Sequence, residues 1–328
     1  MWPATLPRSV QRGVCVLATV GLLGGCAPGS MSTQAQRIGV DDGTDPCRRE
    51  VVALDSTGNF FAEDIIKGAA IGALGGALLG GLTGGGRGAL IGAAAGGVAG
   101  AAGGYFSALQ NQARDQATLV ARMQSDMQAE GVQIDRTQAA FNQLAACRFY
   151  QAQSIRNAYA THQIPREYAV QQMAVVRERA QRDLALARLV SDKIIARGQE
   201  FEMAADQVSP GTKAYIASTK PPPRQVVTRG AVPIKVVPTA NAPTIAQTTP
   251  REQVTVQSTQ GDYALVETPS GTRGYAPLAS LNIPPSPSTG AGDEVRSLAG
   301  SNANRRDSFA QSVSVVQSAQ AGAFEIAG

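Results

Sequence analysis

Residues 68–104 read GAAIGALGGALLGGLTGGGRGALIGAAAGGVAGAAGG, and glycine occupies every fourth position without a gap. On an α-helix, residues four apart share one face, so each run of glycines forms a groove without side chains. A second helix can approach such a groove closely, as small residues allow in membrane helices. The register therefore predicts a close contact between two helices, made by Gly68, Gly72, Gly76, Gly80, Gly84, Gly88, Gly92, Gly96, Gly100 and Gly104.

A turn signal at residues 83–88, TGGGRG, divides this glycine zipper in two. We expect one helix over about residues 63–82 and a second over about 87–109, closed as a helical hairpin within a unit spanning 63–105. Each helix is close to the roughly 20 residues that cross a bilayer. A flexible linker is the alternative, but the intervening residues are mostly Ala, Ile, Leu and Val rather than polar. Whether lipid or protein surrounds the contact stays open.

The N-terminal segment is typical of a secretory signal. Arg8 and Arg12 precede a short apolar run, and residues 1–25 form the predicted signal peptide. The run ends in LLGGC at residues 22–26, which resembles the lipobox of bacterial lipoproteins. That resemblance implies lipid attachment at Cys26 and an outer-membrane anchor facing the periplasm, with the inner membrane as the alternative. Ordinary signal cleavage near Cys26 is the competing interpretation. Residues 26–62 are then an N-terminal tether.

The cysteine content agrees with export. Cys15 leaves with the signal and Cys26 takes the lipid, so Cys47 and Cys147 remain as an even pair in an oxidising compartment. A disulfide between them would close a loop of about 100 residues, which in the chain-entropy model stabilises the fold by about 4 to 5 kcal/mol. Two unrelated thiols are the alternative. We expect no metal site, because the chain has a single histidine and neither cysteine lies in a ligand cluster.

The composition of residues 106–208 is typical of long helices, and we expect an antiparallel helical hairpin there. Apolar residues recur every seven positions, as in half of a coiled-coil seam. The predicted turn contains His162, which we interpret as a solvated residue rather than a catalytic one, and Pro165 starts the second helix. The seven-residue series is Phe106, Ala113, Val120, Met127, Ile134 and Phe141.

Strand patterns dominate the next part of the chain. After a Pro-rich linker at 209–250, strands are predicted at 253–257, 263–267 and 274–276. Residues 251–281, with Gly-Asp-Tyr at 261–263 and Gly-Tyr at 274–275, resemble the bacterial SH3-like family. The resemblance implies a small β-barrel over 251–283, or from 225, with Tyr263 and Tyr275 either as ligand contacts or as core aromatics. Residues 284–328 have few large apolar groups, so we expect a disordered tail.

The predicted fold class is thus mainly α: a glycine-zipper hairpin, a long helical hairpin and a small all-β unit. Over residues 20–105 the chain resembles glycine-zipper envelope lipoproteins of the rickettsial 17-kDa antigen type, which implies a membrane-anchored structural protein that self-associates. An oligomeric pore or secretion channel, and a peptidoglycan-binding hydrolase regulator, are the alternatives.

No catalytic, cofactor or metal motif is present in the sequence, so we expect no enzyme activity and no cofactor. The expected partners are membrane lipid, a second copy of the chain, and peptidoglycan or another envelope protein. Nucleic acid is not expected, because removing Arg8 and Arg12 from a net charge of +4 leaves only +2.

Overall fold

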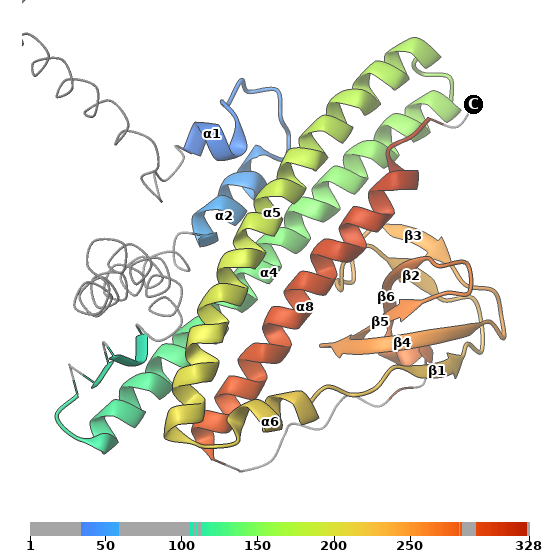
Figure 1. The fold of residues 1–328 in the computed structure, drawn as a ribbon. Helices are drawn as coiled ribbons and strands as arrows, with labels where there is room; N and C mark the ends of the chain where they lie inside the picture. Colours follow the sequence, from blue (N-terminus) through green and yellow to red (C-terminus); the bar gives the residue numbers. More distant parts are fainter. Residues whose placement is uncertain are drawn as a thin grey trace, which may run out of the picture.

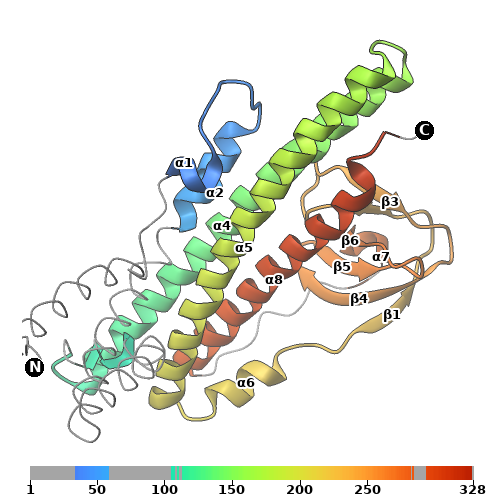
Figure 2. The same ribbon diagram turned by 45° about the horizontal axis from the view of Figure 1, so that its top comes forward.

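The computed structural model describes residues 34–58, 105–107, 109–110, 113–281, 283 and 293–326. Helices α4, α5 and α8 run side by side, and the sheet lies next to α8, whereas α1 and α2 pack on the opposite flank against α4 and α5 (Figures 1 and 2). The elements are α1 (Gln34–Ile38), α2 (Arg48–Gly58), α4 (Gln116–Ala160), α5 (Arg166–Val208), α6 (Thr212–Ser218), β1 (Arg224–Val227), β2 (Pro233–Lys235), β3 (Thr244–Gln247), β4 (Gln253–Gln260), β5 (Tyr263–Glu267), β6 (Arg273–Pro277), α7 (Leu278–Leu281) and α8 (Glu294–Ala323).

The long helical hairpin predicted over residues 106–208 is confirmed as α4 and α5. The carboxylate of Asp115 caps α4 by accepting a hydrogen bond from the Thr118 N–H at 2.7 Å. Pro165 is the N-cap of α5, in extended backbone, as its fixed φ and missing N–H favour. The chain therefore reverses at the predicted turn.

The seven-residue apolar series on α4 is buried only in part. Met127, Ile134 and Phe141 are at most 2% exposed, whereas Ala113 and Val120 are half-buried. Farther along, the buried positions of α4 follow one another at spacings of one to four residues, so the buried face is wider than one seam. The reason is that three helices pack on α4: its hairpin partner α5, and also α2 and α8.

The tail expected to be disordered is instead largely helical, and this prediction was wrong. Residues 294–323 form α8, which packs against α4 and α5 along the hairpin. Phe309 is fully buried and meets Phe141 of α4 edge to face, with ring centroids 5.6 Å apart. The segment lacks large apolar groups, but Val313 and Val316 add to the same core. Packing against a preformed hairpin compensates for its weak composition.

Two glycines make room for polar side chains of α8. A Cβ on Gly131 of α4 would lie 2.8 Å from the Asn302 amide oxygen, and one on Gly198 of α5 would lie 2.3 Å from the Arg306 Nε. Asn302 donates hydrogen bonds to the Met127 carbonyl and, at 3.0 Å, to the Glu130 carboxylate. Gly131, which weakens an isolated helix, is therefore required by the packing of α8.

The segment expected to be a Pro-rich linker, 209–250, is also folded, which corrects that prediction. It holds α6 and three strands, of which β1 pairs with β4 and β2 with β6. The strands predicted at 253–257, 263–267 and 274–276 are confirmed as β4, β5 and β6. Together they form one antiparallel sheet of six strands in the order β1-β4-β5-β6-β2-β3. Within the described residues β1 and β3 are unpaired edges, so the sheet is open and an SH3-like barrel is not confirmed.

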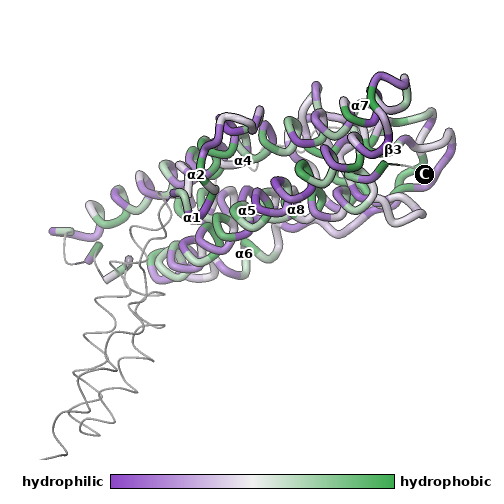
Figure 3. The backbone as a smooth tube through the Cα atoms, turned by 90° about the horizontal axis from the view of Figure 1, so that it is seen from above, coloured by the Kyte–Doolittle hydropathy of each residue, from purple (hydrophilic) through white to green (hydrophobic). Residues whose placement is uncertain are grey.

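None of the helices in the described part of the chain combines the length and apolar character needed to cross a bilayer. Hydrophobic and hydrophilic residues alternate along α4, α5 and α8 (Figure 3), as they do in helices that pack on one side and meet water on the other.

Candidate functional site

The zipper glycines Gly68–Gly104 and the lipid-attachment candidate Cys26 lie outside the described residues. The structure does show how the chain is held on each side of residues 59–104. We call residues 45–58 the upstream junction, and Tyr105 with Leu109 the downstream junction. These two junctions form the candidate site, because they fix where the glycine segment leaves the folded body and where it returns.

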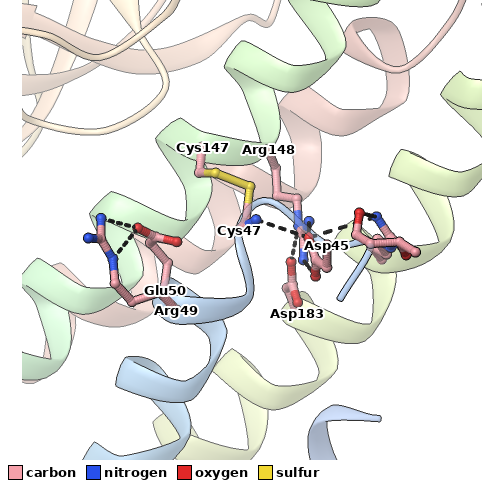
Figure 4. The surroundings of a disulfide bond; sticks show 9 residues. Asp45, Cys47, Arg49, Glu50, Cys147, Arg148 and Asp183 are labelled. Atoms are coloured by element: carbon pink, nitrogen blue, oxygen red, sulfur yellow. Dashed lines mark hydrogen bonds and ion pairs between the residues drawn. A yellow bond between two sulfur atoms is a disulfide. The ribbon is translucent and has the colours of Figure 1, made fainter. Parts of the chain in front are cut away.

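A disulfide holds the upstream junction. Cys47, just before α2, is bonded to Cys147 on α4 across 100 residues, with Cα atoms 6.0 Å apart (Figure 4). The structure thus joins the pair expected from the sequence, and Cys47 is fully buried. A covalent link therefore fixes α2 to the long hairpin. Such bonds persist in oxidising compartments.

A buried guanidinium reinforces this link. Arg148, next to Cys147, points at two carboxylates (Figure 4). It donates to both oxygens of Asp45, at 2.5 and 2.8 Å, and to Asp183 of α5 at 2.6 Å. Arg148 is only 3% exposed. One cation thereby ties together the upstream junction, α4 and α5.

The protonation of this cluster follows from burial and from Arg148. Burial pulls the pKa of Arg148 down, but its bonds to Asp45 and Asp183 outweigh that effect and raise the pKa, so it stays charged. Burial would raise the pKa of Asp45, yet the hydrogen bonds and charge of Arg148 hold that pKa below its usual value. Burial dominates at Asp183 and raises its pKa despite Arg148. The two carboxylates therefore respond to acid in opposite senses.

A second ion pair fixes the end of α2. Arg37 of α1 donates to both oxygens of Asp55, at 2.6 and 2.8 Å, and Asp55 is 3% exposed. At the last residue of α2, a Cβ placed on Gly58 would lie 3.1 Å from the Val190 side chain of α5. The backbone of the upstream junction therefore lies directly on α5.

The downstream junction is held by aromatic packing. The Tyr105 ring lies 4.5 Å from the Phe201 ring of α5, centroid to centroid, and its hydroxyl donates to Asp126 of α4 at 2.9 Å. Leu109 is buried in the same cluster, with Met123 among its neighbours. The returning chain is thus fixed to both long helices without a covalent bond.

Both junctions rest on the same helix. Val190 and Phe201 are eleven residues apart on α5, which corresponds to about three turns and about 16 Å along the helix axis. Three turns bring a residue back to nearly the same face. The structure therefore holds the two ends of residues 59–104 near each other, on one side of α5.

The structure does not leave Tyr275 available as a ligand contact. This residue is 1% exposed, its hydroxyl lies 2.6 Å from the Ser312 hydroxyl of α8, and burial raises the pKa of the phenol to about 12. Tyr263 is half-buried beside Leu265, Tyr275 and Val315. Of the two interpretations offered by the sequence, core aromatic is correct for Tyr275, because α8 covers this face of the sheet.

His162 lies exposed in the turn between α4 and α5, with φ at 55°, as expected for a solvated turn residue. The described part of the chain contains no group of three or more His, Cys, Asp or Glu side chains placed to hold a metal ion.

The charge cluster of Arg148, Asp45 and Asp183 was not predicted from the sequence, although the sequence carries a signal for part of it. Asp45 lies two residues before Cys47, and Arg148 directly follows Cys147. If two cysteines pair, opposite charges beside them are brought together. No comparable pattern marks Asp183, whose partner is reached only through the packing of α5 on α4.

Comparison with known proteins adds one finding. The family described as YMGG-like Gly-zipper matches residues 52–108, from within α2 to the downstream junction. No curated protein and no solved structure matches the chain. Over these residues the chain is similar to YMGG-like glycine-zipper proteins, and this similarity indicates a membrane-associated protein.

Proposed function

We propose that this protein is a non-enzymatic lipoprotein of the bacterial cell envelope. Cys26 carries the lipid, and the glycine zipper forms a helical hairpin that associates with the membrane and with itself. The lipid anchors the chain in the outer membrane, and the helical body with its sheet faces the periplasm. The protein then acts as a structural or interaction protein of the envelope.

The placement of the two junctions carries this proposal. Residues 59–104 form a segment of 46 residues, which would extend about 69 Å as one continuous helix. The structure holds its ends at points about 16 Å apart along α5. Junctions this close together favour the proposed hairpin of two helices packed glycine to glycine over a single pass.

Two further observations support the cellular setting. The disulfide between Cys47 and Cys147 fits a chain that is exported to an oxidising compartment. The similarity to YMGG-like Gly-zipper proteins covers the whole segment between the junctions.

Metabolic palmitate labelling tests the anchor. The wild-type chain should be labelled, Cys26→Ala should not, and Cys15→Ala is the matched control that should keep the label. An unlabelled wild-type chain, or a labelled Cys26→Ala chain, would contradict the lipoprotein assignment.

The zipper is tested in a chain that carries no lipid, because an ordinary cleaved signal peptide replaces its own signal. We expect Gly76→Leu with Gly92→Leu to release the chain from membrane fractions, because both side chains fill the predicted groove. Gly75→Leu with Gly97→Leu adds the same volume outside the register and should leave the chain bound. Equal behaviour of the two pairs would overturn the zipper.

Crosslinking in membranes distinguishes the anchor from the alternative of an oligomeric pore. A ladder of defined oligomers favours a pore, and a monomer or dimer favours the anchor.

A further inference from the structure

A cavity of about 460 Å³ lies where three parts of the fold meet, and nothing described above uses it. Its walls come from α4, the C-terminal end of α8, β3 and the start of β6. Cavities of this size are typical of small-ligand sites. The residues that matter for its chemistry are Phe149, Arg156, Ile245, Arg273, Ser318 and Gly322.

The charge of this cavity is positive. Arg156 and Arg273 line it, and no Asp or Glu does. Within the described part of the chain, Arg156 makes no hydrogen bond or ion pair. Arg273 donates to Gln257 at 2.6 Å, but its Nε is buried without a hydrogen-bond partner, since the nearest carboxylate oxygen, on Glu267, is 3.7 Å away. Arg156 therefore offers unused guanidinium donors to an anion, and Arg273 adds positive charge to the wall of the cavity.

The edge strand of the sheet also lines this cavity. β3 is the last strand in the sheet order, and Pro243, Thr244 and Ile245 line the cavity. An edge strand carries unpaired N–H and C=O groups along its open side. Figures 1 and 2 place β3 beside the C-terminal end of α8. An extended backbone lying there could pair with β3 by strand addition.

We propose that this cavity binds an extended peptide segment that carries carboxylate side chains. The backbone of the segment pairs with the open edge of β3. Its carboxylates bind Arg156 and Arg273, because guanidinium groups form paired hydrogen bonds with carboxylates. The neighbouring apolar side chains of the segment contact Phe149 and Ile245. This inference does not depend on the proposed membrane role, and the body can be tested without either the lipid or a membrane.

Gly322 supplies a way to block the cavity without disturbing the fold. It lies in α8 and lines the cavity, and a Cβ there would meet no atom within 4 Å. Gly322→Leu therefore places a side chain in the open space of the cavity. Gly230 is the matched control, because a Cβ there also meets nothing, and it lies outside the cavity lining.

The test is fluorescence anisotropy of a fluorescein-labelled peptide, Val-Glu-Val-Glu-Val, titrated with the full secreted chain. We expect saturable binding that weakens with added salt, about tenfold weaker binding for Arg156→Ala, and loss of binding for Gly322→Leu. Gly230→Leu should bind as the wild type does.

Three results would overturn the proposal: no binding of the peptide at about 1 mM protein, which corresponds to a very weak affinity; equal binding of Val-Lys-Val-Lys-Val; or unchanged binding by Gly322→Leu. If free glutamate competes as effectively as the unlabelled peptide does, the strand-addition part of the proposal is wrong. Weaker binding of a peptide with N-methylated backbone amides would support it. Circular dichroism of each variant shows that its fold is kept.

Discussion

The two junctions hold the same segment of chain by different means. The upstream junction uses a disulfide and ion pairs, with Cys47 bonded to Cys147 and Arg148 between Asp45 and Asp183. The downstream junction uses the aromatic contact of Tyr105 with Phe201 and its hydrogen bond to Asp126. Reducing agent and acid therefore act mainly on the upstream junction, and removal of apolar contact acts mainly on the downstream one.

The largest effect is expected from removing the disulfide. Replacing Cys47 and Cys147 together by alanine should lower the free energy of unfolding by about 4 to 5 kcal/mol, because the unfolded chain regains the freedom of a loop of 100 residues. Urea unfolding of the oxidised protein measures this. Reductant should destabilise the wild type and leave the double variant unchanged. Equal sensitivity of the two chains to reductant would mean that the bond does not form.

Loss of the cation between the two carboxylates should come next. Arg148→Met leaves Asp45 and Asp183 close together with no partner between them, and breaking a buried pair in this way costs about 3 to 5 kcal/mol. The same unfolding experiment applies, with Arg49→Met as control, because Arg49 is exposed and its one ion pair among the described residues is with its neighbour Glu50. A variant as stable as this control would refute the role assigned to Arg148.

At the downstream junction, Tyr105→Ala should cost about 3 kcal/mol, because the ring leaves its place against Phe201. Tyr105→Phe keeps the ring and removes the hydroxyl with its bond to Asp126, which should cost about 1 kcal/mol. Both losses should be the same with and without reductant. A loss that disappears on reduction would show that the two junctions are coupled.

The smallest effect concerns pH and follows from the two carboxylates. The pKa of Asp45 is lowered in the folded state, so its contribution to stability is present above its unfolded pKa and is lost as the pH falls through the folded value. The pKa of Asp183 is raised, so acidification through that raised value favours the folded state. Asp45→Asn should therefore flatten the loss of stability in strong acid, and Asp183→Asn should flatten the gain in weak acid. Urea midpoints measured from neutral pH downward test this, and identical profiles for the two variants would contradict it.

Local patterns were enough to predict the long helical hairpin and the central strands. Apolar spacing and Pro165 defined α4 and α5, and alternation defined β4 and β5. Cysteine counting predicted the bond between Cys47 and Cys147. In each case the residues that carry the signal lie within one element, or are so few that only one pairing remains.

The missed parts depend on partners far away in the chain. Residues 209–250 were expected to be a linker, because nothing local shows that β1 pairs with β4 or β2 with β6. The segment of α8 was expected to be disordered because it has few large apolar groups, and its buried face includes the polar residues Asn302, Arg306 and Ser312. Those polar groups find their partners on α4, α5 and β6. The same dependence explains why Tyr275 could not be assigned to the core from sequence.

The position of α8 also decides when the molecule can finish folding. α8 follows every other described element along the chain, yet it lies between the hairpin and the sheet and contacts α4, α5, α6 and β6. A ribosome delivers these partners first, and they wait with uncovered apolar faces until α8 arrives. Completion of the core therefore waits until α8 has been made. A chain truncated before α8 would keep these faces uncovered and would therefore be exposed to proteolysis.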